Sequence, residues 1–213
     1  MKKVYHRLIK MAAPSPLQPL KDVMQVFHDV HPPTRSLIGH TWIPRFIETP
    51  HVELTKALLC GVDCDEVYPG IFVGDEGTAR KKDFLAAVGI THVLNTAEGN
   101  GFGQVLTGAD FYADCKIKYL GYNLIDATRT RIIDHFEEGV NFIEDGVKNG
   151  KVLVHCLMGM SRSVSFVAAY LILKKNMTAK EALTTIRKRR EVRPNDGFLV
   201  QLLQLEAKGL EKK

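Results

Sequence analysis

The stretch KVLVHCLMGMSRSVSFVAAYLILKK, residues 151–175, decides the fold. Its first six residues form a valine-rich apolar run of strand length, and an almost wholly apolar helix is expected from about Ser163. A strand that is apolar on both faces is typical of the middle of a parallel sheet that helices cover on both sides. The stretch therefore predicts an α/β fold with a central, mostly parallel sheet flanked by helices.

The sequence on either side continues the alternation of strands and helices. A strand pair broken at Pro69-Gly70 is expected at residues 66–74, and two further strands are expected at residues 91–95 and 117–123. Two amphipathic helices are expected at residues 78–88, ending at Gly89, and at residues 134–147. Thr178 and Glu181 form a capping box that opens another helix. Asn195-Asp196 supply the cap of a last helix, which is expected to run to about residue 205.

Composition narrows the class of protein. The chain has 213 residues, and its formal net charge is +5. No apolar run approaches the roughly 18 residues that a membrane helix needs, which argues against a membrane protein. Four irregularly spaced cysteines do not make a disulfide scaffold, and Cys60 and Cys64 lack the second pair of ligands that a zinc site needs. We therefore expect a reducing, cytoplasmic or nuclear location and no metal site.

The first quarter of the chain differs from the rest. Five of the nine prolines lie before Pro44, and there is little apolar periodicity. We predict an N-terminal extension over residues 1–49, largely disordered, with one short helix near residues 20–27. A second helix is expected at residues 52–59, where a single folded domain over residues 50–213 begins.

The segment HCLMGMSRS, residues 155–163, lies between the predicted buried strand and buried helix. In an open α/β sheet, ligands bind beyond the carboxyl ends of the strands, and here the N-terminus of a helix faces the same place. Backbone N–H groups in such a turn form a nest that fits a phosphate dianion. The nest is expected from Leu157, Met158, Gly159, Met160, Ser161 and Arg162.

The side chains of this segment are those that thiolate chemistry on a phosphate requires. The pKa of Cys156 is expected to fall at the N-terminus of a helix beside a cation. Gly159 lets the backbone curl around an anion, and Arg162 offers a planar fork for two phosphate oxygens. Ser163 can donate a hydrogen bond to the sulfur, while His155 is expected to orient the loop through backbone hydrogen bonds.

HCLMGMSRS resembles the signature loop of the protein tyrosine phosphatases. The segments GITHVLNTAEG (89–99), FYADCKIKYLGYNLID (111–126) and RPNDGFLVQL (193–202) resemble their small, atypical dual-specificity branch. The resemblance extends from about residue 50 to the C-terminus. It implies a protein phosphatase that hydrolyses phosphotyrosine and phosphoserine or phosphothreonine through a phosphocysteine on Cys156. It also implies phosphorylated proteins as partners, and neither cofactor nor metal.

The resemblance assigns two further residues. Asp126 aligns with the general acid that protonates the leaving group, although by chemistry alone it is one of several loop acids. Arg190 aligns with a basic position that in relatives meets a second phosphate of the substrate. The alternative for Arg190 is a solvated charge at a helix end.

Other functions stay open at this point. One alternative is a phosphate-binding interaction module with negligible turnover. Another is an enzyme acting on nucleic-acid 5′ phosphates, which the charge of +6 over residues 174–193 favours and the lack of aromatic stacking clusters disfavours. The uncharged Leu157, Met158 and Met160 argue against a phosphoinositide substrate. The oligomeric state is left open.

Overall fold

A five-stranded sheet forms the centre of the molecule in the computed structural model, which describes residues 18–32, 37–38, 41–42 and 61–210. The strand order is β3-β4-β7-β5-β6, and all neighbours pair parallel except β3, which pairs antiparallel with β4 at one edge. These strands are β3 (Cys64–Tyr68), β4 (Ile71–Gly74), β5 (His92–Asn95), β6 (Lys118–Gly121) and β7 (Val152–His155). The predicted α/β fold with a mostly parallel sheet is confirmed. A separate short pair joins β1 (Leu37–Ile38) to β2 (Thr41–Trp42).

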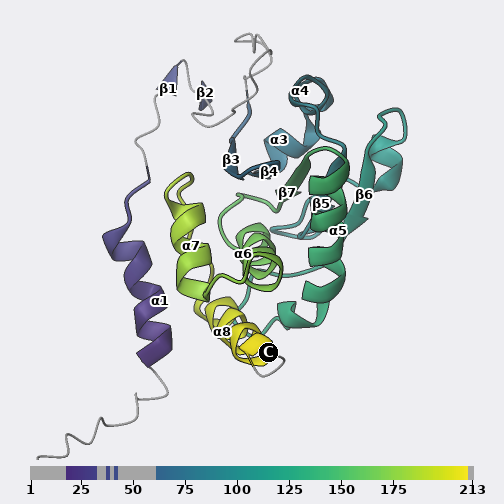
Figure 1. Ribbon diagram of the computed structural model, residues 1–213. Helices are drawn as coiled ribbons and strands as arrows, with labels where there is room; N and C mark the ends of the chain where they lie inside the picture. The colour runs from purple at the N-terminus through teal and green to yellow at the C-terminus, as the bar shows by residue number, and fades with distance from the viewer. Residues whose placement is uncertain (1–17, 33–36, 39–40, 43–60, 211–213) are drawn as a thin grey trace, which may run out of the picture.

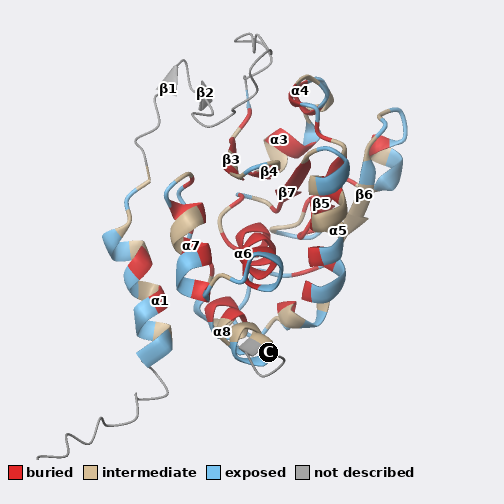
Figure 2. Ribbon diagram, in the orientation of Figure 1, coloured by how far each residue is buried: buried red, intermediate tan, exposed pale blue. Residues whose placement is uncertain are grey.

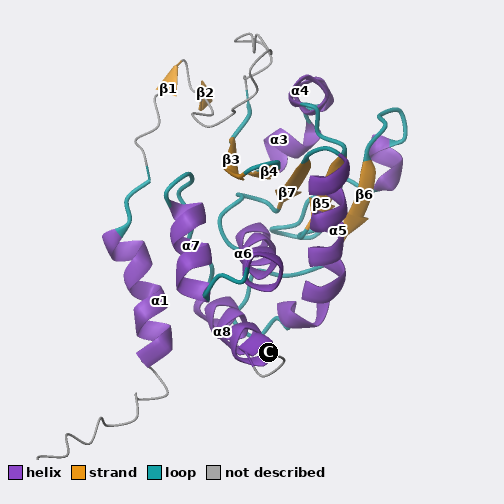
Figure 3. Ribbon diagram, in the orientation of Figure 1, coloured by secondary structure: helices purple, strands orange, loops and turns teal. Residues whose placement is uncertain are grey.

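Helices cover both faces of the sheet (Figure 1, Figure 3). They are α3 (Glu76–Arg80), α4 (Lys82–Val88), α5 (Phe136–Asn149), α6 (Arg162–Lys175), α7 (Ala179–Arg187) and α8 (Asp196–Leu210), with 3-10 turns at Ala109–Tyr112 and Ile132–His135. Side chains of β7 alternate between the faces: Val152 and Val154 pack in the cluster formed by α5 to α8, and Leu153 packs with α3 and α4. None of the helices in the described part of the chain is long and apolar enough to span a membrane.

The central helix α6 is buried on all sides over most of its length, as its almost wholly apolar sequence predicts. Every residue from 162 to 172 is buried, and Figure 2 shows this helix red between its neighbours. A helix in such a position is fixed on all sides by packing. Residues 156–161, between β7 and α6, are the predicted phosphate-binding segment, which we call the phosphate loop. The N-terminus of α6 follows directly on this loop and is therefore held rigidly against the sheet.

The helices at residues 76–88 and at the C-terminus differ from the sequence prediction. The helix expected over residues 78–88 is divided at Lys81, whose backbone leaves the helical region (φ −94°, ψ 78°) and begins a second helix. Asp75 caps the first piece through a bond from the Thr78 N–H, and Gly89 ends the second in the left-handed conformation, as predicted. The last helix runs beyond residue 205, to Leu210. The helix expected at residues 52–59 lies outside the described residues.

Part of the predicted extension packs on the domain. Helix α1 (Gln18–Asp29) lies beside α7 and also contacts α8 (Figure 1). It buries Val23 and Val26 in the large apolar cluster. Arg187 of α7 donates to the carbonyl oxygens at the end of this helix, Phe27 (3.0 Å) and Val30 (2.7 Å). The short helix near residues 20–27 is therefore longer than predicted, and this segment is ordered by tertiary contacts that its own sequence does not reveal.

Candidate active site

Cys156 lies at the carboxyl end of the central strand, directly after β7 and six residues before the start of α6. Its side chain is buried, with 2% of the residue exposed. The sulfur accepts a hydrogen bond from the Gly159 N–H (3.2 Å) and lies 3.5 Å from the Ser163 hydroxyl. The loop between strand and helix is thus wrapped around the cysteine sulfur.

The surroundings of Cys156 favour the thiolate. Burial by itself raises the pKa of the thiol, but the charge of Arg162, the Ser163 hydroxyl and backbone N–H groups of the loop outweigh it. The pKa is therefore lowered from its ordinary value. A buried thiolate at the N-terminus of a helix is a nucleophile held in place.

Gly159 cannot be replaced by a residue with a side chain without moving the loop. Its φ of +66° lies in the left-handed region. A Cβ at this position would lie 2.6 Å from the Gly74 carbonyl oxygen and 2.7 Å from a guanidinium nitrogen of Arg190. Both the conformation and the space therefore require glycine.

Arg162 is buried beside the loop with part of its hydrogen-bonding capacity unused. One terminal nitrogen donates to the Leu124 carbonyl oxygen (2.9 Å). Its Nε is buried without a hydrogen-bond partner in the described structure, and lies 3.6 Å from a carboxylate oxygen of Asp126. An unpaired buried N–H group is costly, and a phosphate oxygen would satisfy it.

Asp126 is brought to the loop from the segment after β6. Its Oδ1 accepts hydrogen bonds from the Ser161 hydroxyl (3.0 Å) and from the Asn195 side-chain amide (2.7 Å). The carboxylate, one-third exposed, thus lies between the phosphate loop and solvent. This is the place that a proton donor to a leaving group must occupy.

Sequence reasoning missed Asn195 as a positioning residue. It was recognised only as a helix cap, and its Oδ1 does accept from the Phe198 N–H (3.0 Å). The side-chain NH₂ group of Asn195 also donates a hydrogen bond to the Asp126 carboxylate and so positions it. The available signal was that an asparagine cap, unlike an aspartate cap, leaves an N–H group free to bind an acid.

His155 lies beneath the loop as a neutral ring. Burial, together with the charges of Arg80 and Arg162, lowers its pKa to about 4. Its Nδ1 is 3.3 Å from the Cys156 carbonyl oxygen, and its own carbonyl accepts from the N–H and hydroxyl of Thr96 (both 2.9 Å). These contacts fix the backbone on both sides of the nucleophile.

The remaining loop residues are held through their carbonyl groups. The Leu157 carbonyl accepts from the Glu76 N–H, and the Met160 carbonyl accepts from the Arg193 N–H. These bonds fix the loop backbone against the scaffold, and the Gly159 N–H points inward to the sulfur. The Met158 side chain is 60% exposed.

The predicted contact of Arg190 with a second substrate phosphate is wrong for this structure. Its side chain is almost fully buried, with 1% of the residue exposed. The guanidinium donates to the carboxylates of Asp63 and Asp65 and to the carbonyl oxygens of Met158 and Gly159, at 2.8 to 3.1 Å. Because the guanidinium is enclosed and its donors are engaged, Arg190 supports the loop from behind and is not available to a substrate.

Comparisons with known proteins agree with this geometry. The family model "Dual specificity phosphatase, catalytic domain" matches residues 71–208. The human tyrosine phosphatase-like serine/threonine/tyrosine-interacting protein is 31% identical over 69% of this chain and 97% of its own, with a TM-score of 0.58. The Yvh1 phosphatase domain from Chaetomium thermophilum is 30% identical over 68% and 95%, with a TM-score of 0.57. Human DUSP28, at 24% identity over 70% and 94%, shares the fold with a TM-score of 0.59.

The family match spans well over half of the chain and includes the whole phosphate loop together with Asp126. This chain therefore belongs to the dual specificity phosphatases, in the protein tyrosine phosphatase superfamily.

Proposed function

We propose that this chain is an active protein phosphatase that hydrolyses phosphotyrosine and phosphoserine or phosphothreonine through a phosphocysteine on Cys156. One observation carries the proposal: the buried Nε of Arg162 has no hydrogen-bond partner in the described structure, and the charge of Arg162 helps to lower the pKa of Cys156. A phosphoryl group bound in the loop would accept a hydrogen bond from the Arg162 Nε and would react with the Cys156 thiolate.

The reaction would proceed in two steps. The Cys156 thiolate attacks phosphorus, the S–P bond forms, and the P–O bond to the substrate breaks while Asp126 gives its proton to the departing oxygen. Arg162 and the loop N–H groups hold the three equatorial oxygens as charge spreads over them. Asp126 then takes a proton from water, which attacks phosphorus and releases phosphate. Ser163 stabilises the departing thiolate by donating a hydrogen bond to it.

A second candidate is a phosphate-binding module with negligible turnover. A relative at 31% identity whose name describes a phosphatase-like interacting protein keeps this candidate open. Against it, this chain has a cysteine, an arginine and an aspartate in an arrangement that can perform both steps. Phosphorylated proteins are the substrates we favour, because the loop offers no lysine for the additional phosphates of an inositol headgroup.

Turnover of p-nitrophenyl phosphate and phenyl phosphate in the presence of a chelator separates the two candidates. Wild type should turn over both, and Cys156→Ser should be inactive because serine is not ionised at neutral pH. Asp126→Asn should lose at least about a hundredfold on phenyl phosphate and much less on p-nitrophenyl phosphate, whose leaving group needs no proton.

Equal losses of Asp126→Asn on both substrates would contradict the general-acid role. A wild type as inert as Cys156→Ser, yet still binding phosphopeptide, would favour the recognition module and refute the proposed enzyme.

A further inference from the structure

Exposed apolar side chains gather around the candidate active site. Among the residues that the structure describes, six large apolar side chains are exposed. Four of them lie in the loops that follow β5, β6 and β7, at the edge of the sheet where Cys156 lies: Phe102, Leu106, Ile125 and Met158. Single exposed apolar residues are ordinary, but their concentration around one site marks a binding surface. We call these four residues the apolar rim.

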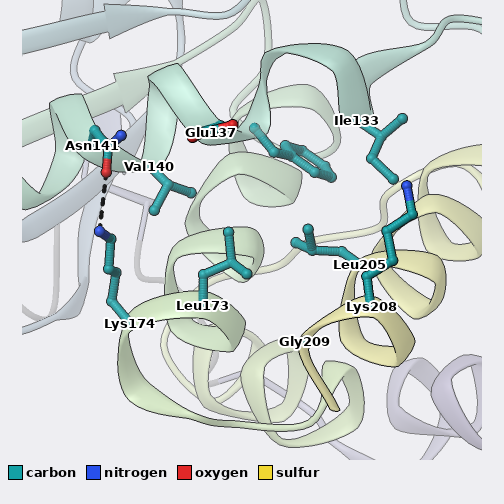
Figure 4. A pocket seen from close by; sticks show the side chains of 10 residues that line it. Ile133, Glu137, Val140, Asn141, Leu173, Lys174, Leu205, Lys208 and Gly209 are labelled. Atoms are coloured by element: carbon teal, nitrogen blue, oxygen red, sulfur yellow. Dashed lines mark hydrogen bonds between the residues drawn. The ribbon is translucent and has the colours of Figure 1, made fainter. Parts of the chain in front are cut away.

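The other two exposed apolar residues lie on helices and not in these three loops. Leu173 lines a hollow between α5, α6 and α8, next to Val140 and Leu205 (Figure 4). It is 11 residues along α6 from Arg162, or about 16 Å along the helix axis. Val200 lies on α8. Leu173 is therefore a control remote from the site, and Val200 is a control on a helix next to it.

The loop that carries Phe102 is anchored beside the nucleophile. Ala97 and Val105 form a small buried cluster with Cys156, and the Val105 N–H donates to the Ala97 carbonyl (2.8 Å). Leu106, directly after Val105, is 64% exposed and projects from this cluster. The base of the loop thus contacts the catalytic cysteine itself.

The tip of the same loop is braced by Gln104. Its side-chain oxygen accepts from the Gly101 N–H (2.8 Å), and its nitrogen donates to the Glu98 carbonyl (3.2 Å) and to Asn123 (2.5 Å). A Cβ at Gly99 or Gly101 would collide with this amide at 2.5 to 2.6 Å. The glycines therefore admit the Gln104 side chain into the loop, and Phe102 is fully exposed at a braced tip.

Ile125 and Met158 complete the rim on the other sides of the site. Ile125 precedes the candidate acid Asp126, and its carbonyl accepts from the Ala127 N–H in a tight turn (2.9 Å). Met158 is in the phosphate loop, where Arg190 holds its carbonyl. Both side chains are at least 60% exposed. The rim thus includes side chains from the loops after β6 and β7 as well as from the loop after β5.

We infer that the apolar rim binds apolar or aromatic side chains that flank the phosphorylated residue of a protein substrate. The inference rests on the proposed function and names the substrate class of the same site. Charge favours a protein segment over an anionic membrane, because Glu98 is the sole charged residue between 97 and 108 and residues 157–161 carry no charged side chain. Membrane-surface sites of this size are instead rich in lysine and arginine.

The test compares two phosphotyrosine peptides of equal length and charge, one with leucine and phenylalanine beside the phosphotyrosine and one with serine at those positions. Wild type should hydrolyse the apolar peptide with a kcat/KM about tenfold higher, as expected for partial burial of two apolar side chains. Phe102→Ser combined with Leu106→Ser should reduce this preference to about twofold. Leu173→Ser and Val200→Ser should keep it, and all variants should match wild type on p-nitrophenyl phosphate.

A binding measurement with Cys156→Ser keeps this inference separate from the proposed function. If neither wild type nor any variant hydrolyses p-nitrophenyl phosphate, the proposed phosphatase activity is refuted. The ratio of the Kd values of the two peptides still decides whether the rim binds apolar side chains. Equal Kd and kcat/KM values for the two peptides would overturn the inference. So would rim variants that lose sedimentation with phosphatidylserine vesicles while their peptide preference stays unchanged.

Discussion

Two buried arginines lie against the same phosphate loop and differ in what they bind. Arg162, at the start of α6, has one carbonyl partner and an Nε without a hydrogen bond in the described structure. Arg190 lies behind the loop, and its guanidinium is engaged by two carboxylates and two carbonyl oxygens. The two arginines are therefore alike in burial and charge, and of the two only Arg162 has an N–H group without a hydrogen bond.

The difference separates a ligand-binding arginine from a structural one. A buried guanidinium with engaged donors stabilises the native state, because removing it breaks buried ion pairs and hydrogen bonds at once. A guanidinium with an unpaired N–H is incomplete until a ligand arrives. Substitution of each arginine should accordingly affect a different measurement, stability for Arg190 and catalysis for Arg162.

The largest effect is expected from Arg190→Met. The buried ion pair between Arg190 and Asp65 would be broken, so the free energy of unfolding should fall by about 3 to 5 kcal/mol and Tm by roughly 10 °C. Thermal unfolding followed by circular dichroism measures the change, and Arg190→Lys should recover part of it. An unchanged Tm together with a raised KM for doubly phosphorylated peptides would instead show that Arg190 binds substrate.

Arg162→Lys should show the opposite pattern. Lysine keeps the charge but loses the planar fork, so kcat/KM should fall by about 10² to 10³ while Tm stays close to that of wild type. Inorganic phosphate should raise the Tm of wild type, by linkage of binding to folding, and should do so far less for the variant. Equal stabilisation of both proteins by phosphate would show that the unpaired Nε is not the anion ligand.

A smaller effect is expected from His155, which is buried neutral beneath the loop. Its pKa is lowered from 6.5 to about 4, so between these values the unfolded chain binds a proton that the folded protein does not. Stability should therefore fall as pH decreases from about 6.5 to 4, by up to about 3 kcal/mol. Urea unfolding across this range measures the slope, with His155→Asn as the comparison. An equal slope in His155→Asn would assign the loss to other groups.

The sequence was sufficient wherever the determining residues are close together in the chain. The strand, loop and helix around Cys156 were predicted from one stretch because apolar pattern, glycine and cap are local signals. The aligned position of Asp126 came from the family resemblance and lies against the loop as expected. The break at Lys81 was missed because a single residue outside the helical region leaves the apolar periodicity intact.

Contacts between distant residues could not be predicted. Arg190 and Asp63 are separated by 127 positions, and a basic residue in a charged run gives no sign that it is buried. The exposed end of a helix is the ordinary place for such a residue. The packing of α1 on α7 was hidden for the same reason, since Arg187 and Val30 are 157 positions apart.

The position of α1 has a consequence for how this catalytic domain could be moved between proteins. The shared family region begins at residue 71, yet the helix at residues 18–29 supplies Val23 and Val26 to the core and two carbonyl acceptors to the buried Arg187. A fragment cut at the family boundary would uncover that apolar surface and leave those donors without acceptors. The region shared with the family is thus smaller than the region that packs together, and a domain moved to another protein would keep these contacts only if it carried its N-terminal helix with it.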